Sequence, residues 1–394
     1  MLVGAGAAVG ATALTGAGAA AISNIALLDA QAAAQTAVGV SREPFYGKHQ
    51  SGIETAHQSQ AAFNVYRLND SANAKTIAGV MRVASMEAAR LCDGWPGLSD
   101  TDPELAEAPA RLTITFGFGV GFFEVAGKGE QIPKGFKEIP ALKIDALQAE
   151  WSGGDLLIQI GSDDPTTLAH ATRHMTRVVS SIAVPHYSQH GFMRAAGTIP
   201  SGETPRNLFG QKDGTVNPRT KAEFTEQVWA GEETGWFAGG TQLVLRRIAM
   251  QLDTWDLLDT HAKSESIGRD IKTGAPLTGT EEFDTPDLDA TNELGLSVIP
   301  DFSHIRRSAP KDSRQKFLRR PFNYDNGFDA EGKPDVGLIF AAYTSNIRDR
   351  FIPVQERLAE MDLLNLWTTP IGSSVFVIPP GCNEGGFIGE TLLS

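Results

Sequence analysis

Cysteine is scarce in this sequence, and its scarcity narrows the chemistry that the chain can carry. The 394 residues include two cysteines, Cys92 and Cys382, which lie far apart and match no Cys-x-x-Cys spacing of a metal or redox site. We expect both thiols to be buried, or one of them to be free, and a single disulfide in an oxidising compartment is the alternative. Nothing in the cysteine spacing indicates a metal or redox function.

Basic residues are also in the minority. Lys and Arg number 34 against 47 Asp and Glu, which gives a formal net charge of −13, and no dense run of Lys and Arg occurs. A partner of nucleic acid or of an anionic membrane surface needs such a basic patch. We therefore expect no nucleic-acid partner, and neutral or cationic small substrates fit the charge better.

The N-terminus lacks both charge and a long, uninterrupted apolar run. Residues 1–36 are rich in Ala and Gly and uncharged until Asp29, and the first Lys or Arg is Arg42. Gly, Thr and Ser interrupt the apolar run, which makes it a poor spanning helix. With a small-residue cleavage site at Ala30–Ala32, the segment is typical of an export signal without its basic start. We expect no stable membrane insertion after its removal; the alternatives are a disordered tail, or an anchor if cleavage fails.

The rest of the chain has the composition of a two-domain globular protein. Hydrophobic residues make up 41% of the sequence, and the length favours two packed domains. After residue 44 the pattern reads strand, helix, strand, strand, helix, strand, and then repeats in approximately that order, which suggests duplication. Asp70 and Ser71 are suitable caps for the first helix. The first half is expected to contain strands over 63–68, 112–118 and 155–160 and helices over 71–91 and 164–180.

The second half repeats the pattern with longer connections. Strands are expected over 242–248, 337–343 and 374–378, and a helix is marked by Ile347, Phe351, Val354 and Leu358. The predicted fold class is α+β, with two sandwiches that each place helices over an antiparallel sheet. Residues 184–240 and 262–336 are expected to be long, turn-rich loops, and loops of that length are usually functional or disordered.

The most informative segment is Gly210–Gly214, with the sequence Gly-Gln-Lys-Asp-Gly. Its two glycines let the backbone pass close to a flat ligand, and they leave the Asp213 carboxylate aimed at that ligand. By itself the segment is an ordinary turn with a capping Asp. It lies within Arg206–Pro218, however, and the chain later contains Asp301–Arg306 and Leu318–Arg320.

Together these three segments resemble the haem-binding signature of the dye-decolourising peroxidase family, in its exported, deferrochelatase/peroxidase-like type. The resemblance covers nearly all of the chain after residue 44 and includes Pro44–Gln50 and Ile371–Phe376. It implies two ferredoxin-like domains, at residues 44–195 and 196–394, with one haem b per chain in the C-terminal domain. It also implies a periplasmic or extracellular location, reached by a twin-arginine route whose arginine pair is absent from this chain.

The resemblance also implies roles for single residues. His304 is expected to be the axial ligand of the haem iron. Asp213 is expected to take a proton from peroxide and return it to the departing oxygen. Arg319 then stabilises the negative charge that builds on that oxygen. Gly210 and Gly214 bring the backbone to the cofactor.

Two arginines and one departure from the family pattern accompany these roles. Arg306 is expected to neutralise a haem propionate or to support the proximal side, with an exposed salt bridge as the alternative. Arg320 is second to Arg319 for the distal role, on spacing from the ligand alone. Leu366 stands where the family pattern leads us to expect an acidic residue that hydrogen-bonds the proximal imidazole, and Asp362 is the residue that would compensate.

Other patterns carry less chemistry. His170 and His174 have the spacing of a zinc pair on a helix but lack a third ligand. Gly117-x-Gly119-x-Gly121 follows a strand without the helix and acidic residue of a dinucleotide site, so a close approach of chains is the better interpretation. The six tryptophans and five tyrosines include candidates for a surface oxidation site, which the sequence does not single out.

The sequence therefore leads to one favoured function and two alternatives. The favoured function is a haem peroxidase that reduces hydrogen peroxide and oxidises phenolic or dye-like aromatic donors by one-electron steps. The first alternative is a haem-handling or iron-release protein in which turnover is secondary. The second is an α+β binding module without a cofactor, and a homo-oligomer is compatible with all three.

Overall fold

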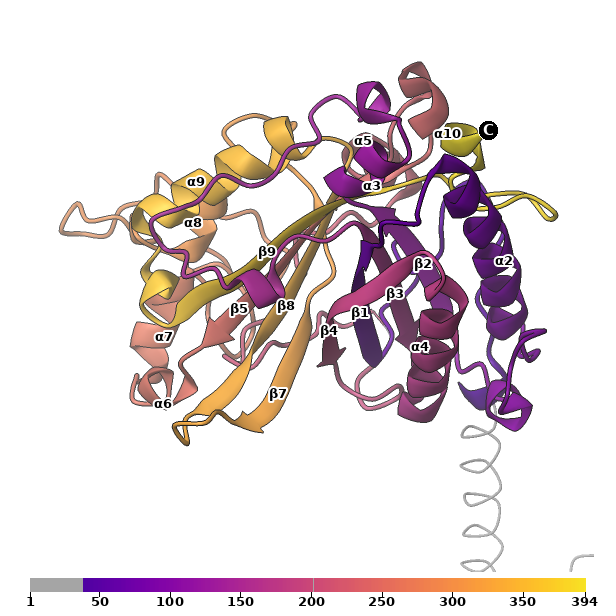
Figure 1. Ribbon diagram of the computed structural model, residues 1–394. Helices are drawn as coiled ribbons and strands as arrows, with labels where there is room; N and C mark the ends of the chain where they lie inside the picture. Colours follow the sequence, from indigo (N-terminus) through magenta and orange to yellow (C-terminus); the bar gives the residue numbers. More distant parts are fainter. Residues whose placement is uncertain (1–37, 201) are drawn as a thin grey trace, which may run out of the picture.

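A computed structural model describes residues 38–200 and 202–394, so the predicted export signal at residues 1–36 lies outside the described part. The described chain is α+β, with strands in the middle and helices on its flanks (Figure 1). In the N-terminal half the elements are β1 (Gln60–Leu68), α2 (Ala74–Cys92), β2 (Thr113–Phe118), α3 (Val120–Val125), β3 (Leu156–Ser162), α4 (Pro165–Val179) and β4 (Ala183–Phe192).

The C-terminal half contains five strands and several short helices. Its strands are β5 (Thr241–Met250), β6 (Leu318–Arg319), β7 (Phe322–Phe328), β8 (Pro334–Thr344) and β9 (Thr368–Ile378). Its helices are α5 (Lys221–Gln227), α6 (Leu252–Trp255), α7 (Thr260–Ile267), α8 (His304–Ser308), α9 (Ile352–Met361) and α10 (Glu390–Leu393), with the short turns η5 (Ile347–Phe351) and η6 (Leu363–Leu366) around α9.

The two halves share one strand order. All pairings are antiparallel, in the order β2-β3-β1-β4 in the first half and β9-β5-β8-β7 in the second. When the four long strands of each half are numbered along the chain, both orders read 2-3-1-4 or its reverse. The predicted pair of ferredoxin-like sheets is therefore confirmed.

Single residue pairs join the two sheets. Phe118 pairs with Val377 where β2 meets β9, and Phe192 pairs with Asn323 where β4 meets β7. The strands consequently form one nine-stranded sheet in which β6 is the last strand of the order. An apolar core that includes Phe63, Leu245 and Tyr343 fills the space between the two halves, so the sheets pack face to face.

Three expectations of local structure were wrong. Helix α2 begins at Ala74, not at Ser71, because Asn73 forms its capping box and its side chain accepts the backbone N–H groups of Lys75 and Thr76. Strands β4 and β7 lie in segments that we expected to be loops. Both strands lie where the two sheets meet, and many of their side chains are exposed. Their sequences therefore lack the continuous apolar run that would indicate a strand.

The long connections of the C-terminal half carry the candidate site. Residues 193–240 lead into β5, and residues 251–321 lead from β5 to β7 with α6, α7 and α8 on the way. Short helices and turns replace the two long helices of the N-terminal half there (Figure 1). Within the described residues, no helix has the length and apolarity to cross a membrane.

Candidate active site

Asp213 and Arg319 form a partly buried ion pair. Asp213 Oδ1 lies 3.2 Å from Arg319 Nη1, and the two side chains are 10% and 21% exposed. The contact lacks hydrogen-bond geometry, so Asp213 Oδ1 is a buried acceptor without a hydrogen-bond donor in the described chain. Asp213 Oδ2 accepts a long hydrogen bond of 3.5 Å from Asn207 Nδ2. The carboxylate thus keeps an open acceptor beside a guanidinium.

A network of backbone hydrogen bonds shapes the loop that carries Asp213. The Asp213 N–H donates to the carbonyl of Pro205, and Arg206 Nη1 donates to the carbonyls of Gly210 and Ile271. Gly210 has φ 78° and Gly214 has φ 124°, conformations that favour glycine. The two glycines are therefore needed for the path of the loop on both sides of Asp213.

Lys212, which precedes Asp213 in the loop, pairs with Glu282 and not with Asp213. Lys212 Nζ lies 2.6 Å from Glu282 Oε2, and Thr215 donates to Glu282 Oε1. Burial alone raises the pKa of Glu282, but the hydrogen bonds from Lys212, Thr204 and Thr215 outweigh it, and the pKa is lowered overall. Glu282 therefore stays ionised and holds Lys212, which leaves Arg319 as the cation next to Asp213.

His304 is held by a buried carboxylate. Its Nδ1 lies 2.6 Å from Asp362 Oδ2, and the His304 side chain is 28% exposed whereas that of Asp362 is 4% exposed. A carboxylate only accepts, so this contact favours the tautomer that has its proton on Nδ1 and its lone pair on Nε2. Nε2 has no hydrogen-bond partner within residues 38–200 and 202–394, so it is available to a ligand.

The acidic partner of the imidazole is therefore Asp362, and the expectation of one at residue 366 was wrong. Asp362 ends α9 and begins η6, and its Oδ1 accepts the Leu364 N–H at 3.0 Å. Leu366 is 62% exposed, so its side chain faces solvent. The compensation by Asp362 that the sequence suggested is the arrangement that the structure has.

The neighbouring arginines point elsewhere. Arg306 donates from Nε and Nη2 to the carbonyl of Ile299 and lies 3.5 Å from Asp301. Arg320 is buried, and its guanidinium donates to Thr55, Ala56 and Gln58, all in the N-terminal half. Burial lowers the pKa of Arg320 to about 10. Successive side chains of a strand face opposite sides, which is why Arg319 and Arg320 separate.

An apolar cluster joins the segments that carry these residues. Phe209 of the Asp213 loop packs against Trp255 with ring centroids 4.5 Å apart, and Ile305, next to His304, packs against the same cluster. Leu364, which follows Asp362, belongs to it as well. The structure thus brings the loop, α8 and η6 onto one apolar cluster that includes residues of β5 and β8.

The weaker candidates have structural explanations. His174 Nε2 lies 2.9 Å from Glu87 and His170 Nε2 lies 3.0 Å from Asp100, all buried, and no group of three or more metal-ligating side chains occurs in the described chain. A Cβ on Gly119 would lie 2.0 Å from the carbonyl oxygen of Gly154, which confirms a close approach of chains.

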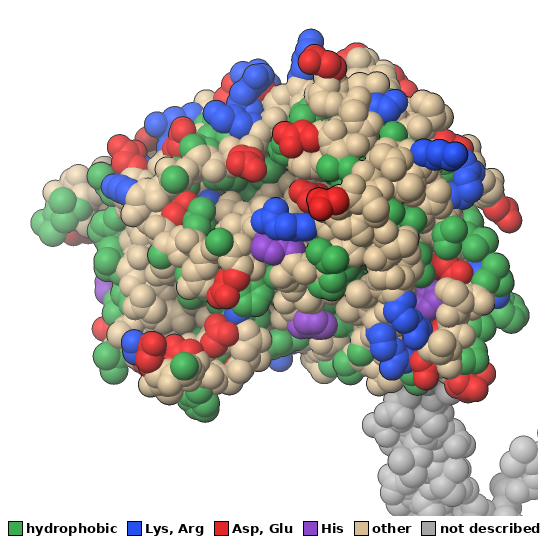
Figure 2. Space-filling model, in the orientation of Figure 1, with side chains coloured by type: hydrophobic (Ala, Val, Ile, Leu, Met, Phe, Trp, Pro, Cys, Tyr) green, Lys and Arg blue, Asp and Glu red, His purple; other side chains and the backbone are tan. Residues whose placement is uncertain are grey.

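Both thiols are free and buried, as expected. Burial raises the pKa of Cys92 well above its usual range and that of Cys382 to about 11, so neither is a ready nucleophile. Acidic and basic side chains alternate over the face shown in Figure 2, without a continuous basic patch on that face. This agrees with the net charge of −13.

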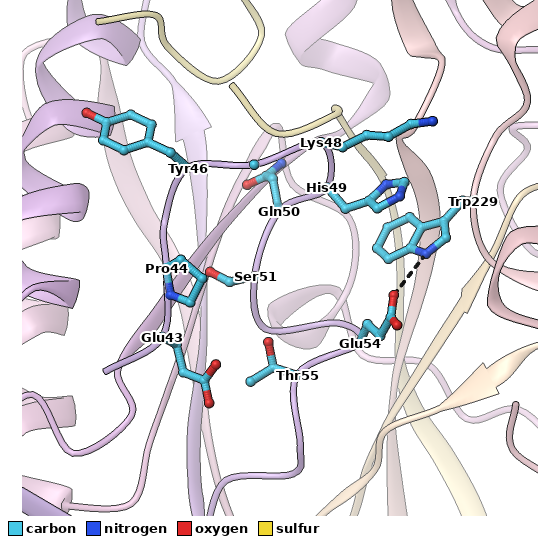
Figure 3. Close-up of a pocket in the computed structure, with 11 residues that line it drawn as sticks. Glu43, Pro44, Tyr46, Lys48, His49, Gln50, Ser51, Glu54, Thr55 and Trp229 are labelled. Carbon is cyan, nitrogen blue, oxygen red and sulfur yellow. Dashed lines mark hydrogen bonds between the residues drawn. The ribbon is translucent and has the colours of Figure 1, made fainter. Parts of the chain in front are cut away.

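A cavity lies away from the Asp213–Arg319 and His304–Asp362 pairs. It has a volume of about 290 Å³ and is lined mainly by residues 43–51 together with Glu54, Thr55 and Trp229 (Figure 3). His49 stacks on Trp229 with ring centroids 3.9 Å apart, and Trp229 Nε1 donates to Glu54 Oε2. The lining includes neither the Asp213 and Arg319 pair nor the His304 and Asp362 pair. Sequence reasoning noticed this segment only as part of a motif.

Comparisons with known proteins agree with the geometry. Residues 50–193 match the family described as Dyp-type peroxidase, N-terminal, and residues 204–383 match Dyp-type peroxidase, C-terminal. The chain is 32% identical to a dye-decolorizing peroxidase of Thermobifida fusca, over 83% of this chain and 78% of that protein. It is 31% identical to a deferrochelatase of Escherichia coli O157:H7, over 89% and 87%. A DyP-type peroxidase structure from Cellulomonas bogoriensis superposes with a TM-score of 0.88 at 42% identity, covering 91% of this chain and 99% of that one.

Proposed function

The chain belongs to the Dyp-type peroxidase family, and from this membership we propose how its own side chains divide the work of the reaction. The protein is a haem-dependent peroxidase that reduces hydrogen peroxide and oxidises phenolic or dye-like donors by one-electron steps. When bound, the haem iron supplies the redox centre for both half-reactions.

The side chains present fit a haem. His304 offers an unprotonated, partly exposed Nε2 whose ring is fixed from behind by Asp362. Asp213 Oδ1 is a buried acceptor without a donor, which is unusual unless another group binds there. The half-buried side chains of Ile248, Ile305 and Phe340 add an apolar surface at the same cluster.

His304 and Asp362 hold the proximal side. Nε2 of His304 is the ligand atom, and the hydrogen bond from Nδ1 to Asp362 sets the tautomer and the ring orientation. The carboxylate increases the electron donation of the imidazole because it draws the Nδ1 proton toward itself. Arg306 supports α8 through the Ile299 carbonyl and Asp301, and it is a candidate partner for a haem propionate.

Asp213 and Arg319 would act on the peroxide. Asp213 Oδ1 would accept one proton of hydrogen peroxide and return it to the oxygen that leaves as water. Arg319, 3.2 Å from that oxygen atom of Asp213, stabilises the negative charge that develops during cleavage. Gly210 and Gly214 allow the positive φ angles that the loop has on both sides of Asp213. The Asp213–Arg319 ion pair is the observation that carries the proposal. It joins a Gly-rich turn to a residue about a hundred positions downstream, and both side chains are partly buried.

Three variants test these roles beside the parent protein. The parent, His304→Ala, Asp213→Asn and Arg319→Leu are reconstituted with haem, and absorption spectra and peroxide-dependent dye oxidation are measured. We expect a Soret band in all but His304→Ala, whose band is weak or shifted. Turnover should fall by about 10²–10⁴-fold in Asp213→Asn and about 10²–10³-fold in Arg319→Leu. Parent-like turnover in either distal variant would refute its role.

Relatives named deferrochelatase support a second candidate function, a haem-handling protein in which turnover is secondary. In that case, incubation of the haem-loaded protein without a donor releases iron and leaves free porphyrin, which is measured by fluorescence and with an iron chelator. Peroxide turnover without release of porphyrin supports the peroxidase alone.

Export is proposed from the N-terminal composition. Residues 1–36, Ala/Gly-rich and uncharged until Asp29, form the body of a signal that ends near Ala30–Ala32. N-terminal sequencing of the protein recovered from the periplasm or medium tests this. A mature chain that starts between residues 31 and 37 supports export, and a full-length chain retained in the cytoplasm contradicts it.

A further inference from the structure

A short edge strand carries Arg319, and its outward backbone groups need partners. β6 pairs with β8 so that Leu318 lies opposite Tyr343 and Arg319 lies opposite Ala342. The Arg320 N–H donates to the carbonyl of Ala341 at 2.8 Å. In an antiparallel pair, the backbone groups of alternate residues point to the partner and away from it, so those of Arg319 point away from β8. β6 is the last strand in the order of the sheet, and among the described residues no strand pairs with its outer edge.

One side chain satisfies both of these backbone groups. Asn217 Nδ2 donates to the Arg319 carbonyl at 2.7 Å, and the Arg319 N–H donates to Asn217 Oδ1 at 2.9 Å. An asparagine amide has the one donor and the one acceptor that this two-point contact needs, side by side. It therefore imitates a neighbouring strand at this residue.

The same residue is tied to the loop of Asp213. The Asn217 N–H donates to the carbonyl of Gly214 at 2.9 Å, which closes a turn directly after Asp213. A Cβ on Gly214 would lie 3.2 Å from Asn217 Nδ2, so the turn and the amide are packed closely. Pro218 favours an extended backbone at Asn217 and limits how far its side chain can move.

We propose that Asn217 is a positioning residue for the distal pair, because its amide fastens the backbone of Arg319 to the turn that carries Asp213. The inference rests on the proposed function and extends it to a residue outside the Gly210–Gly214 segment. The amide fixes where the Arg319 side chain starts, and the turn fixes where the Asp213 side chain starts. The 3.2 Å separation between guanidinium and carboxylate follows from these two anchor points.

The test uses haem-reconstituted parent protein, Asn217→Ala, Arg319→Leu and the double variant. The affinity of the ferric protein for cyanide is measured from the Soret shift, together with the rate constant for reaction with hydrogen peroxide and the KM for a dye. We expect Asn217→Ala to weaken cyanide binding and to slow the peroxide reaction by on the order of 10–10²-fold, since misplacement of about 1 Å has effects of that size. The KM for the dye should stay at the parent value.

A double-mutant cycle separates positioning from an independent effect. If Asn217 acts through Arg319, the double variant reacts with peroxide no more slowly than Arg319→Leu alone. Additive losses, or parent-like cyanide affinity and peroxide reactivity in folded Asn217→Ala, overturn the inference. If Asn217→Ala does not fold, Asn217→Asp replaces it, because it keeps the acceptor for the Arg319 N–H and lacks the donor. A smaller loss in the same direction is expected there, and parent-like values overturn the inference.

Asn73→Ala is the matched control. The Asn73 side chain likewise bonds two backbone groups, since it accepts the N–H groups of Lys75 and Thr76 at 3.1 and 3.2 Å, but it does so as the cap of α2 in the other half. It should lower the thermal midpoint of the haem-free protein and leave cyanide affinity unchanged, whereas Asn217→Ala changes cyanide affinity. Parent-like peroxide reactivity in Arg319→Leu refutes the proposed function itself. Impaired Arg319→Leu beside parent-like Asn217→Ala refutes only the role of Asn217.

Discussion

Replacement of Asp362 by Asn tests how far one buried carboxylate controls the proximal imidazole. The carboxylate is 2.6 Å from His304 Nδ1, and its side chain is 4% exposed, so solvent screens the contact little. An asparagine keeps the shape, and its Oδ1 can still accept a hydrogen bond from the Nδ1–H group, but it removes the negative charge. Hydrogen bonds to charged groups contribute about 1.5–3 kcal/mol and neutral ones about 0.5–1.5 kcal/mol, so the substitution removes about 1–1.5 kcal/mol.

Loss of the negative charge at residue 362 destabilises the ferric protein more than the ferrous one. The negative charge of Asp362 favours the more positive ferric state, so Asp362→Asn raises the midpoint potential of the haem iron. A difference of about 1.4 kcal/mol corresponds to about 59 mV for one electron, which sets the expected size of the shift. The assay is a spectroelectrochemical titration of the reconstituted protein, with dye turnover measured in parallel.

Leu366→Glu is the matched control for this prediction. Residue 366 is where the sequence pattern alone places the acidic partner, but its side chain is 62% exposed. A new carboxylate there is screened by water and should leave the potential near the parent value. An unchanged potential in Asp362→Asn, or a larger shift in Leu366→Glu than in Asp362→Asn, would show that Asp362 does not tune the imidazole.

Three further predictions concern the buried polar cluster of the N-terminal half. His174→Leu leaves the Glu87 carboxylate buried without its partner and should lower the free energy of unfolding by about 3–5 kcal/mol in urea, with haem binding unchanged. Gly97→Ala places a Cβ 1.9 Å from Glu87 Oε2 and should cost about 1–3 kcal/mol in the same assay. Burial raises the pKa of Asp100, but hydrogen bonds from the Asp102 N–H and a neighbouring imidazole lower it overall. Its contribution to stability is therefore present above its unfolded pKa of about 4 and lost as the pH falls through the folded value, so Asp100→Asn should flatten the acid limb of urea stability measured against pH.

The sequence predicted the architecture because its strong signals are local. The strand at residues 63–68 belongs to a short, continuously buried run, and the helix that became α4 buries residues at helical spacing; a single segment reveals both signals. Strands β4 and β7 were missed because many of their side chains are exposed, which leaves no continuous apolar run, although each strand pairs mainly within its own half, β4 with β1 and β7 with β8. The proposed domain boundary near residue 195 remains a prediction of the sequence.

The residues of the candidate site could be predicted where a sequence motif identifies them. They could not be predicted where the choice between neighbouring residues depends on the three-dimensional structure. Spacing favoured Arg319 over Arg320, and the reason, opposite faces of an edge strand, appears only in the fold. The acidic partner of His304 was placed four residues too late, because the end of α9 and the start of η6 decide which side chain turns inward. Asn217 gave no signal of its own, since its two contacts join residues about a hundred positions apart.

The repeated topology suggests why one half became a site and the other did not. In each half, two crossover connections cover the sheet, and in each an imidazole on one connection meets a carboxylate on the other: His174 on α4 with Glu87 on α2, and His304 on α8 with Asp362 at the end of α9. The first pair is 1–2% exposed and closed over by Gly97, so its imidazole has no room for a ligand. The imidazole of the second pair is 28% exposed, and its second nitrogen has no partner in the described chain. The same contact therefore locks two helices in one half and leaves an imidazole nitrogen accessible in the other, which is the nitrogen that the proposed function assigns to the haem iron.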